Sequence, residues 1–206
     1  MLGRAAAGDV VNVRSLLERG ANAATRDDGG WSPLHSAASA GRSEVIEELI
    51  RSGVSLDDGA GSSGTTAIIL AASKGHQVIV SSLLAASANA QATDRSGSTA
   101  LHRAAGNDHV AIIDVLLAAC PAALDARDAD GQTPFHVAAI HQKEAACLAL
   151  AEAGAQLDTV STEGEAPARL LKPSLRVRLG MASEDEEAAD HTDWLAAHFP
   201  VFNPPR

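Results

Sequence analysis

The sequence predicts an all-α solenoid of about six helix-turn-helix units joined by short β-hairpin loops. Glycines recur at intervals of 33 or 34 residues, and each is followed by a Ser/Thr turn, paired alanines and a pair of bulky aliphatic residues. A repeat of this length is typical of chains in which each unit contacts only its neighbours. Alanine is abundant and aromatic residues make up 2% of the chain, which favours closely packed helices. The repeated glycines are Gly30, Gly64, Gly97, Gly131 and Gly164.

The second unit shows how the elements follow from the residues. Turn-forming residues at 27–30 precede Ser32, a natural N-cap, and a proline in the first helical position. The first helix presents small residues and ends at Gly41, which reverses the chain. Aliphatic residues at 45–50 then form the buried stripe of a second helix, which ends at Gly53.

The same pattern divides the whole chain, with atypical units at both ends. We expect the repeat domain to cover 1–172 and to be followed by an acidic C-terminal tail, 173–206, that is largely disordered. Within the tail, Trp194–Phe202 is either a short docking motif or a segment that folds back as a cap. The predicted units are approximately 1–26, 27–60, 61–93, 94–127, 128–160 and 161–172.

Two tetrapeptides carry a specific resemblance to a known family. Ser32-Pro33-Leu34-His35 and Thr133-Pro134-Phe135-His136 resemble the turn of the ankyrin repeat, and the resemblance extends over 2–172. It implies a stack whose hairpin tips and inner helices line a concave face, where variable residues choose a protein partner. The histidines of this turn, together with His102, are expected to tie it down by hydrogen bonds.

Charge and composition exclude several classes of function. The formal net charge is −10, and 181–206 hold six carboxylates against one arginine, so an acidic chain without a Lys/Arg run is a poor nucleic-acid binder. We find no stretch of ~20 apolar residues and no signal segment, which predicts a protein of the cytoplasm, the nucleus or both, without membrane association. We also expect the protein to be a monomer.

Catalytic, cofactor and metal sites are also not expected. Residues 59–64 spell G-x-G-x-x-G, but they fall in the hairpin between two units rather than in a βαβ fold. His76, His109 and His141 are expected to lie one per unit at the turn between helices, too far apart to share a metal. Cys120 and Cys147 are expected to be stacked core residues. No nucleophile is accompanied by a partner base, which argues against an enzyme.

The candidate binding residues lie on the predicted concave face. Basic residues gather in its middle, at Arg42, Lys74, Arg95 and Arg103, which favours a partner that presents carboxylates, with Trp31 as an aromatic anchor. The alternative is that these basic residues are scattered on a solvated face and have no partner. The candidate residues are Asp28, Trp31, Ser39, Arg42, Ser73, Lys74, His76, Arg95, Arg103, Asp130, Gln132 and His141.

Longer segments resemble one branch of the ankyrin proteins. Residues 27–42, 70–74, 87–90 and 100–105 are similar to the gankyrin family in order and register. That resemblance implies a non-ATPase chaperone that holds the C-terminal domain of one ATPase subunit on its concave face during assembly of the 26S proteasome regulatory particle. Relative to that family the chain begins inside the second repeat. The alternative function is a generic scaffold or adaptor in signalling or transcriptional regulation.

Overall fold

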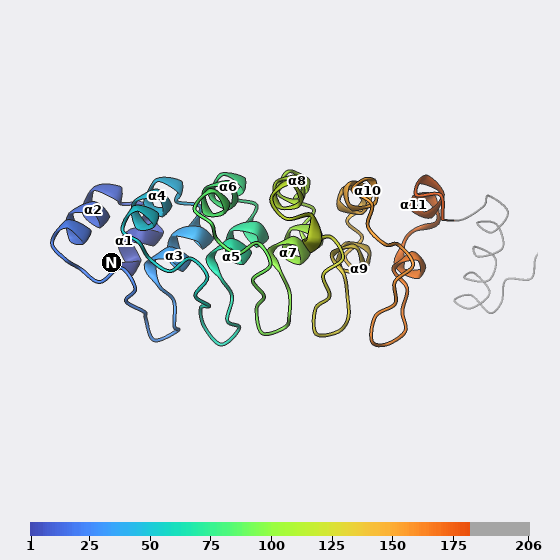
Figure 1. The fold of residues 1–206 in the computed structure, drawn as a ribbon, viewed down its shortest axis with the longest axis horizontal. Helices are drawn as coiled ribbons and strands as arrows, with labels where there is room; N and C mark the ends of the chain where they lie inside the picture. Colours follow the sequence, from blue (N-terminus) through green and yellow to red (C-terminus); the bar gives the residue numbers. More distant parts are fainter. Residues whose placement is uncertain (182–206) are drawn as a thin grey trace, which may run out of the picture.

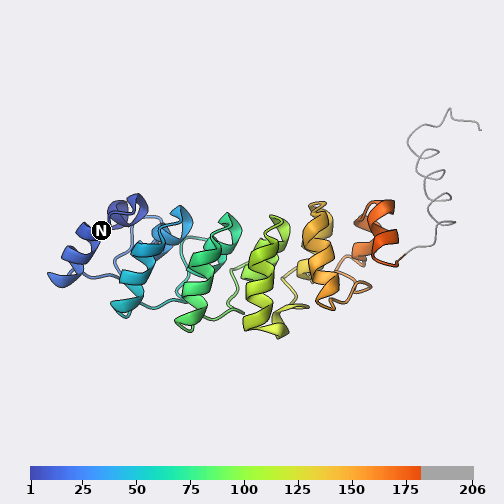
Figure 2. The same ribbon diagram turned by 90° about the horizontal axis from the view of Figure 1, so that it is seen from above.

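The computed structural model describes residues 1–181, and within them helices stack in two layers along one axis (Figure 1). The layers confirm the predicted all-α solenoid. Viewed from above, the outer helices lie side by side like rungs (Figure 2). The inner layer consists of α1 (Leu2–Ala7), α3 (Pro33–Ala40), α5 (Ala67–Lys74), α7 (Ala100–Gly106) and α9 (Pro134–Ile140). The outer layer consists of α2 (Val10–Glu18), α4 (Ser43–Arg51), α6 (Gln77–Ala85), α8 (Val110–Ala119) and α10 (Glu144–Glu152).

The last unit extends beyond residue 172. A short 3-10 helix, η2 (Pro167–Leu170), takes the inner position, and α11 (Pro173–Arg178) takes the outer one. Leu175 of α11 is 5% exposed and belongs to the hydrophobic core. The first residues assigned to the acidic tail are therefore a packed helix, because Leu171 and Leu175 bury their side chains against the preceding unit. The rest of the predicted tail, including Trp194–Phe202, lies outside the described residues.

The core is built from alanines between the inner helices and larger aliphatics beneath the outer ones. Ala37, Ala71, Ala104 and Ala138, one from each of the inner helices α3, α5, α7 and α9, are fully buried. Such small side chains let adjacent helices approach closely, and dispersion contacts add up over the stack. None of the helices within 1–181 is long and apolar enough to cross a membrane.

Hairpins project from the helices along one edge of the stack (Figure 1). Each is closed by backbone hydrogen bonds, such as Asp94 N to Ser98 O at 3.1 Å and Ala60 N to Thr65 O at 2.9 Å. The latter pair brackets Gly61 and Gly64, so the G-x-G-x-x-G segment is a hairpin, as predicted. Successive tips also bond to one another, as Ala129 N donates to Ser96 O at 2.9 Å.

A residue in the left-handed region separates the two helices of each unit. It is a glycine in the first three units, for example Gly41 at φ 73°, whereas Asp108 (φ 63°) and Gln142 (φ 54°) occupy it later. Asp108 also accepts a hydrogen bond from Ala146 N, at 2.8 Å, in the next unit. His76, His109 and His141 lie at the turns between helices, one per unit, as expected, but His141 caps the end of α9, whereas Lys143 occupies the position of His76 and His109 before the outer helix.

Candidate protein-binding face

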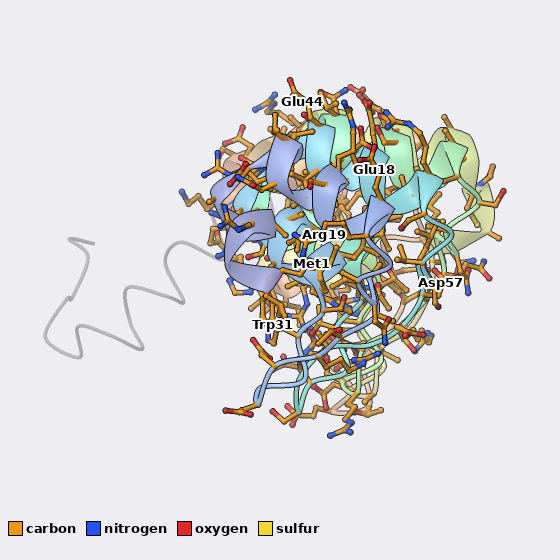
Figure 3. The ribbon with its side chains drawn as sticks, turned by 90° about the vertical axis from the view of Figure 1, so that its left-hand side faces the viewer. Met1, Glu18, Arg19, Trp31, Glu44 and Asp57 are labelled. Carbon is orange, nitrogen blue, oxygen red and sulfur yellow. The ribbon has the colours of Figure 1, made fainter. Side chains whose placement is uncertain are left out.

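We call the solvent-facing side of the inner helices and the hairpins beside them the inner face. Figure 3 looks along the stack and shows Trp31 on this side, where the helices meet the hairpins. Asp57 lies on the opposite side of the stack and Glu44 lies over the outer helices. Trp31 is half-buried, its ring edge-on to His35 at a centroid distance of 6.4 Å.

Buried histidines fix the inner helices that carry this face. His102 Nδ1 accepts hydrogen bonds from the backbone N–H of Thr99, at 3.2 Å, and from its hydroxyl, at 2.9 Å. The proton therefore resides on Nε2, which donates to the carbonyl of Gln132 in the next hairpin at 3.0 Å. His35 bridges Ser32 and Asp58 O in the same way. The predicted tying role of these histidines is confirmed, and burial lowers the pKa of both imidazoles.

The third unit departs from this arrangement. Ile69 occupies the histidine position of α5, and the buried hydroxyl of Thr66 has no hydrogen-bond partner. In the fifth unit His136 Nδ1 contacts Thr133 Oγ1 at 2.9 Å. Burial lowers the pKa of this imidazole and nearby backbone groups of Glu165 and Thr159 act to raise it, but its buried Nε2 makes no hydrogen bond of normal geometry. A well-formed bridge to the next hairpin is thus made by His35 and His102 and is absent after α5 and after α9.

A second set of long side chains covers the turns between inner and outer helices. The His76 ring lies over Gly41, where a Cβ would meet its Cε1 at 2.7 Å, and its Nε2 bonds the Ser39 carbonyl at 3.2 Å. Arg42 lies over Gly8 in the same way, and its Nε donates to Ala6 O at 2.9 Å. These two candidate binding residues therefore have structural contacts with the preceding unit.

Arg103, another candidate, has a carboxylate partner in its own unit. Its guanidinium bonds Asp94 Oδ2 at 2.5 Å and approaches Ser96 Oγ at 3.3 Å. Burial raises the pKa of the Asp94 carboxyl, but hydrogen bonds from Ser96 and Arg103 outweigh it, so that the net pKa lies below its ordinary value. The pair stiffens the hairpin beside α7, and it neutralises part of the positive charge that Arg103 brings to the inner face.

The candidates at the hairpin tips serve mainly to join one tip to the next. Arg95 bonds Ser62 O through Nη1 at 2.5 Å, and Asp130 accepts from the backbone and hydroxyl of Thr162 through its own carbonyl. Gln132 is half-buried, and its carbonyl receives the bond from His102. The carboxyl group of Asp28 is exposed. From the sequence, we expect these residues to contact a partner protein. In the structure the backbone groups of Arg95, Asp130 and Gln132 also form hydrogen bonds between successive units.

The remaining candidates line the inner helices and face solvent. Lys74 is exposed at the end of α5, Ser39 and Ser73 are half-buried, and His141 is exposed at the end of α9. Val137, which the sequence analysis missed, belongs with them: it lies one turn before His141, and its Cγ1 approaches within 3.0 Å the point that a Cβ on Gly106 would occupy. The repeat register could have identified Val137 from the sequence, because Val137 occupies in α9 the same solvent-facing position that Arg103 occupies in α7.

Charge differs sharply between the two layers. The charged side chains of the inner helices are all basic, namely Arg4, Lys74, Arg103 and, on η2, Arg169. The outer helices carry both signs with acidic residues in excess, and Glu48 accepts hydrogen bonds from Arg14 and Arg51, which lower its pKa to about 2. The inner helices therefore present only basic charge, whereas the hairpins of the inner face also carry carboxylates, such as Asp28 and Asp130.

The two cysteines are not stacked as expected. Cys147 is buried on α10, and burial raises the pKa of its thiol to about 12. Cys120 is half-buried at the end of α8 and occupies a different position of its unit, because 27 residues rather than a full repeat separate the two. Both are free thiols. Within residues 1–181, no three His, Cys, Asp or Glu side chains come close enough together to hold a metal ion.

A family model for ankyrin repeats in three copies matches residues 2–94 and again 79–161. The chain belongs to the ankyrin-repeat family. Ankyrin repeats mediate protein–protein interactions, so this solenoid is a protein-binding module whose candidate surface is the inner face. The two matched ranges cover the five helix pairs that precede η2.

Curated relatives share the repeats over short stretches. A mouse 2-5A-dependent ribonuclease is 51% identical over 47 residues, or 22% of this chain and 6% of the relative. Human neurogenic locus notch homolog protein 4 is 40% identical over 77 residues, covering 37% and 4%. Human ankyrin repeat and SOCS box protein 3 is 38% identical over 88 residues, covering 42% and 17%. The chain thus spans less than a fifth of each of these relatives.

Proposed function

We propose that the inner face binds an acidic segment of a partner protein. The observation that carries this proposal is the segregation of charge, because every charged side chain on the inner helices within 1–181 is basic. Ile140 adds an exposed aliphatic side chain to the same face. Binding is stoichiometric and involves no chemistry, since the rigid stack presents its face already formed, which lowers the entropic cost of association.

The partner that we propose is the C-terminal domain of a proteasomal ATPase subunit, bound during assembly of the 26S regulatory particle. Its support is the sequence resemblance of residues 27–42, 70–74, 87–90 and 100–105 to the gankyrin family. A cytoplasmic or nuclear location goes with this proposal. The relatives described above favour a second candidate, a generic ankyrin scaffold or adaptor, because they are ankyrin-containing proteins of varied kinds.

Binding of the full chain to each purified ATPase C-terminal domain, measured by calorimetry at two salt concentrations, tests the proposal. We expect one domain to bind, and Lys74→Glu to weaken its affinity about tenfold, as loss of a central interface contact does. Ser81→Glu places a glutamate on the exposed side of α6 and is the control; it changes the net charge by one unit, whereas Lys74→Glu changes it by two. Arg103 is a poor choice, because its loss leaves the buried carboxylate of Asp94 unpaired.

The outcomes separate the candidates. If none of the ATPase domains binds, the chaperone proposal is wrong and the adaptor remains. If a domain binds equally well to the Lys74→Glu and Ser81→Glu variants, the inner face is not the surface that holds it.

A further inference from the structure

The inner surface of α7 and α9 forms an apolar ledge with basic neighbours. Val137, Ile140 and His141 lie three and four residues apart on one side of α9, and Val137 and His141 flank Gly106 of α7. Ile140 is 41% exposed, whereas the equivalent positions of α3 and α5 are the small residues Ser39 and Ser73. We call the four residues Gly106, Val137, Ile140 and His141 the α9 ledge.

The sequence that follows the described residues has the complementary composition. Residues 184–193 contain six carboxylates and no lysine or arginine, and residues 194–202 contain Trp194, Leu195, Phe199, Val201 and Phe202. Aromatic residues are otherwise rare in this chain. An acidic stretch joined to an aromatic one is the type of ligand that a basic face with an apolar ledge accepts.

We propose that residues 184–202 of this chain bind its own inner face, with the aromatic residues on the α9 ledge and the preceding carboxylates across η2, which carries the exposed Arg169. The segment thereby occupies the surface that the proposed function assigns to a partner. The contact itself does not depend on the proposed function; only its consequence, competition with a partner, rests on that function. A partner must displace the segment before it binds, so the affinity of the full chain is lowered by the fraction of molecules in which the face is covered.

Reach and local concentration allow this contact. Residues 182–193 span at most about 40 Å when extended, whereas α9 and α7 lie one and two units back from α11, at roughly 10 Å per unit. A tether of this length gives an effective concentration in the millimolar range, so an intrinsic dissociation constant of about 1 mM already covers half of the molecules. A few aromatic contacts are therefore sufficient.

The outer layer is the competing surface, and its charge disfavours it. Val78 on α6 is 65% exposed, and the outer sides of α6, α8 and α10 are rich in alanine and valine. The charged residues of α8 and α10 are Asp114, Glu144 and Glu152, all acidic. Like charges repel a carboxylate-rich segment that crosses them, whereas Arg169 on η2 attracts it.

Paramagnetic relaxation in the full chain tests the contact. A spin label is attached at His198→Cys in a Cys120→Ser background, because Cys147 is buried and its thiol is protonated. We expect loss of amide signal intensity at Gly106, Ile140 and His141. Intensities at Val78 and Ala111 on the outer helices are expected to be retained. Replacing Trp194 and Phe199 by alanine in the same labelled chain is expected to restore the lost signals.

Each result decides the inference. Loss of amide signal on the outer helices overturns the inference, and so does the absence of any signal loss beyond the neighbourhood of α11. Signal loss on the inner face that persists in the alanine variant overturns it as well. Partner affinity supplies an independent readout, expected to rise at least twofold when Trp194 and Phe199 are replaced. If the contact is observed but no partner binds, only the proposed function fails; if a partner binds without the contact, only this inference fails.

Discussion

The hydroxyl of Thr66, which has no hydrogen-bond partner, can be compared with the bonded hydroxyl of Thr99 by the same Thr→Val substitution at both positions. Thr66 and Thr99 occupy the same N-cap position in successive units, and both are 2% exposed. Thr99 Oγ1 bonds the His102 ring, whereas Thr66 Oγ1 has no partner because Ile69 stands in place of the histidine. Thr→Val keeps the shape and the β-branching in both places and removes only the hydroxyl.

The expected costs differ because the lost hydrogen bonds differ. Thr99→Val removes the cap and takes one donor from the buried imidazole, and loss of a cap costs about 0.5–2 kcal/mol. Leaving a buried polar atom under-satisfied costs about 1–3 kcal/mol, so a total near 2 kcal/mol is expected for Thr99→Val. Thr66→Val removes a hydroxyl that was buried without compensation, so we expect the free energy of unfolding to stay the same or to rise slightly.

Urea unfolding followed by circular dichroism at 222 nm measures the difference. With a common slope, the Thr99→Val midpoint is expected to fall and the Thr66→Val midpoint to stay at or above wild type. Ile69→His supplies the missing ring, and Thr66→Val in that background is expected to become costly, a coupling that the double-mutant cycle reports. Equal costs for Thr66→Val and Thr99→Val in the wild-type chain would refute the role assigned to the histidine.

Two further predictions concern the turns and the response to acid. Gly41→Ala is expected to destabilise the protein more than Gly53→Ala in the same urea assay. Both backbones are left-handed, but only at Gly41 does a Cβ meet a neighbouring ring, at 2.7 Å. Stability is expected to fall below pH 6.5, because burial lowers the folded-state pKa of the three imidazoles and the unfolded chain binds protons more tightly. A second loss follows between pH 4.5 and about 2, where Glu48 becomes protonated in the folded state, and Asp94, whose pKa is also lowered, adds to it; Glu48→Gln is expected to reduce this second loss and retain the first.

The repeat pattern predicted most of the fold because its signals are local. Ser32, Gly41 and the contact of each turn histidine with its N-cap residue involve neighbours within a few residues, so spacing alone placed them correctly; the bonds of His35 and His102 to the next hairpin are long-range and follow from the stacking. The prediction failed where it relied on counting. Cys120 and Cys147 are 27 residues apart and occupy different positions of their units.

The candidate face was harder to predict because its chemistry depends on contacts across the chain. Arg103 was recognised as basic, but its pairing with Asp94 arises only when the hairpin folds beside α7. The contact of Arg42 with Ala6 O likewise joins residues 36 positions apart. Which of the twelve candidates bind a partner stays a prediction, whereas their positions in the stack are now defined.

The unbonded Nε2 of His136 gives the solenoid a weak end. His35 and His102 each tie their unit to the hairpin that follows, so those junctions open only when a buried hydrogen bond breaks. The junctions after α5 and α9 both lack this lock, but the junction after α9 has only the short unit of η2 and α11 beyond it within the described residues. A stack whose stability is summed from neighbouring interfaces melts first where those contacts are fewest. Pulled from its two ends, the solenoid is therefore expected to unzip from η2 and α11 inward, giving way one unit at a time.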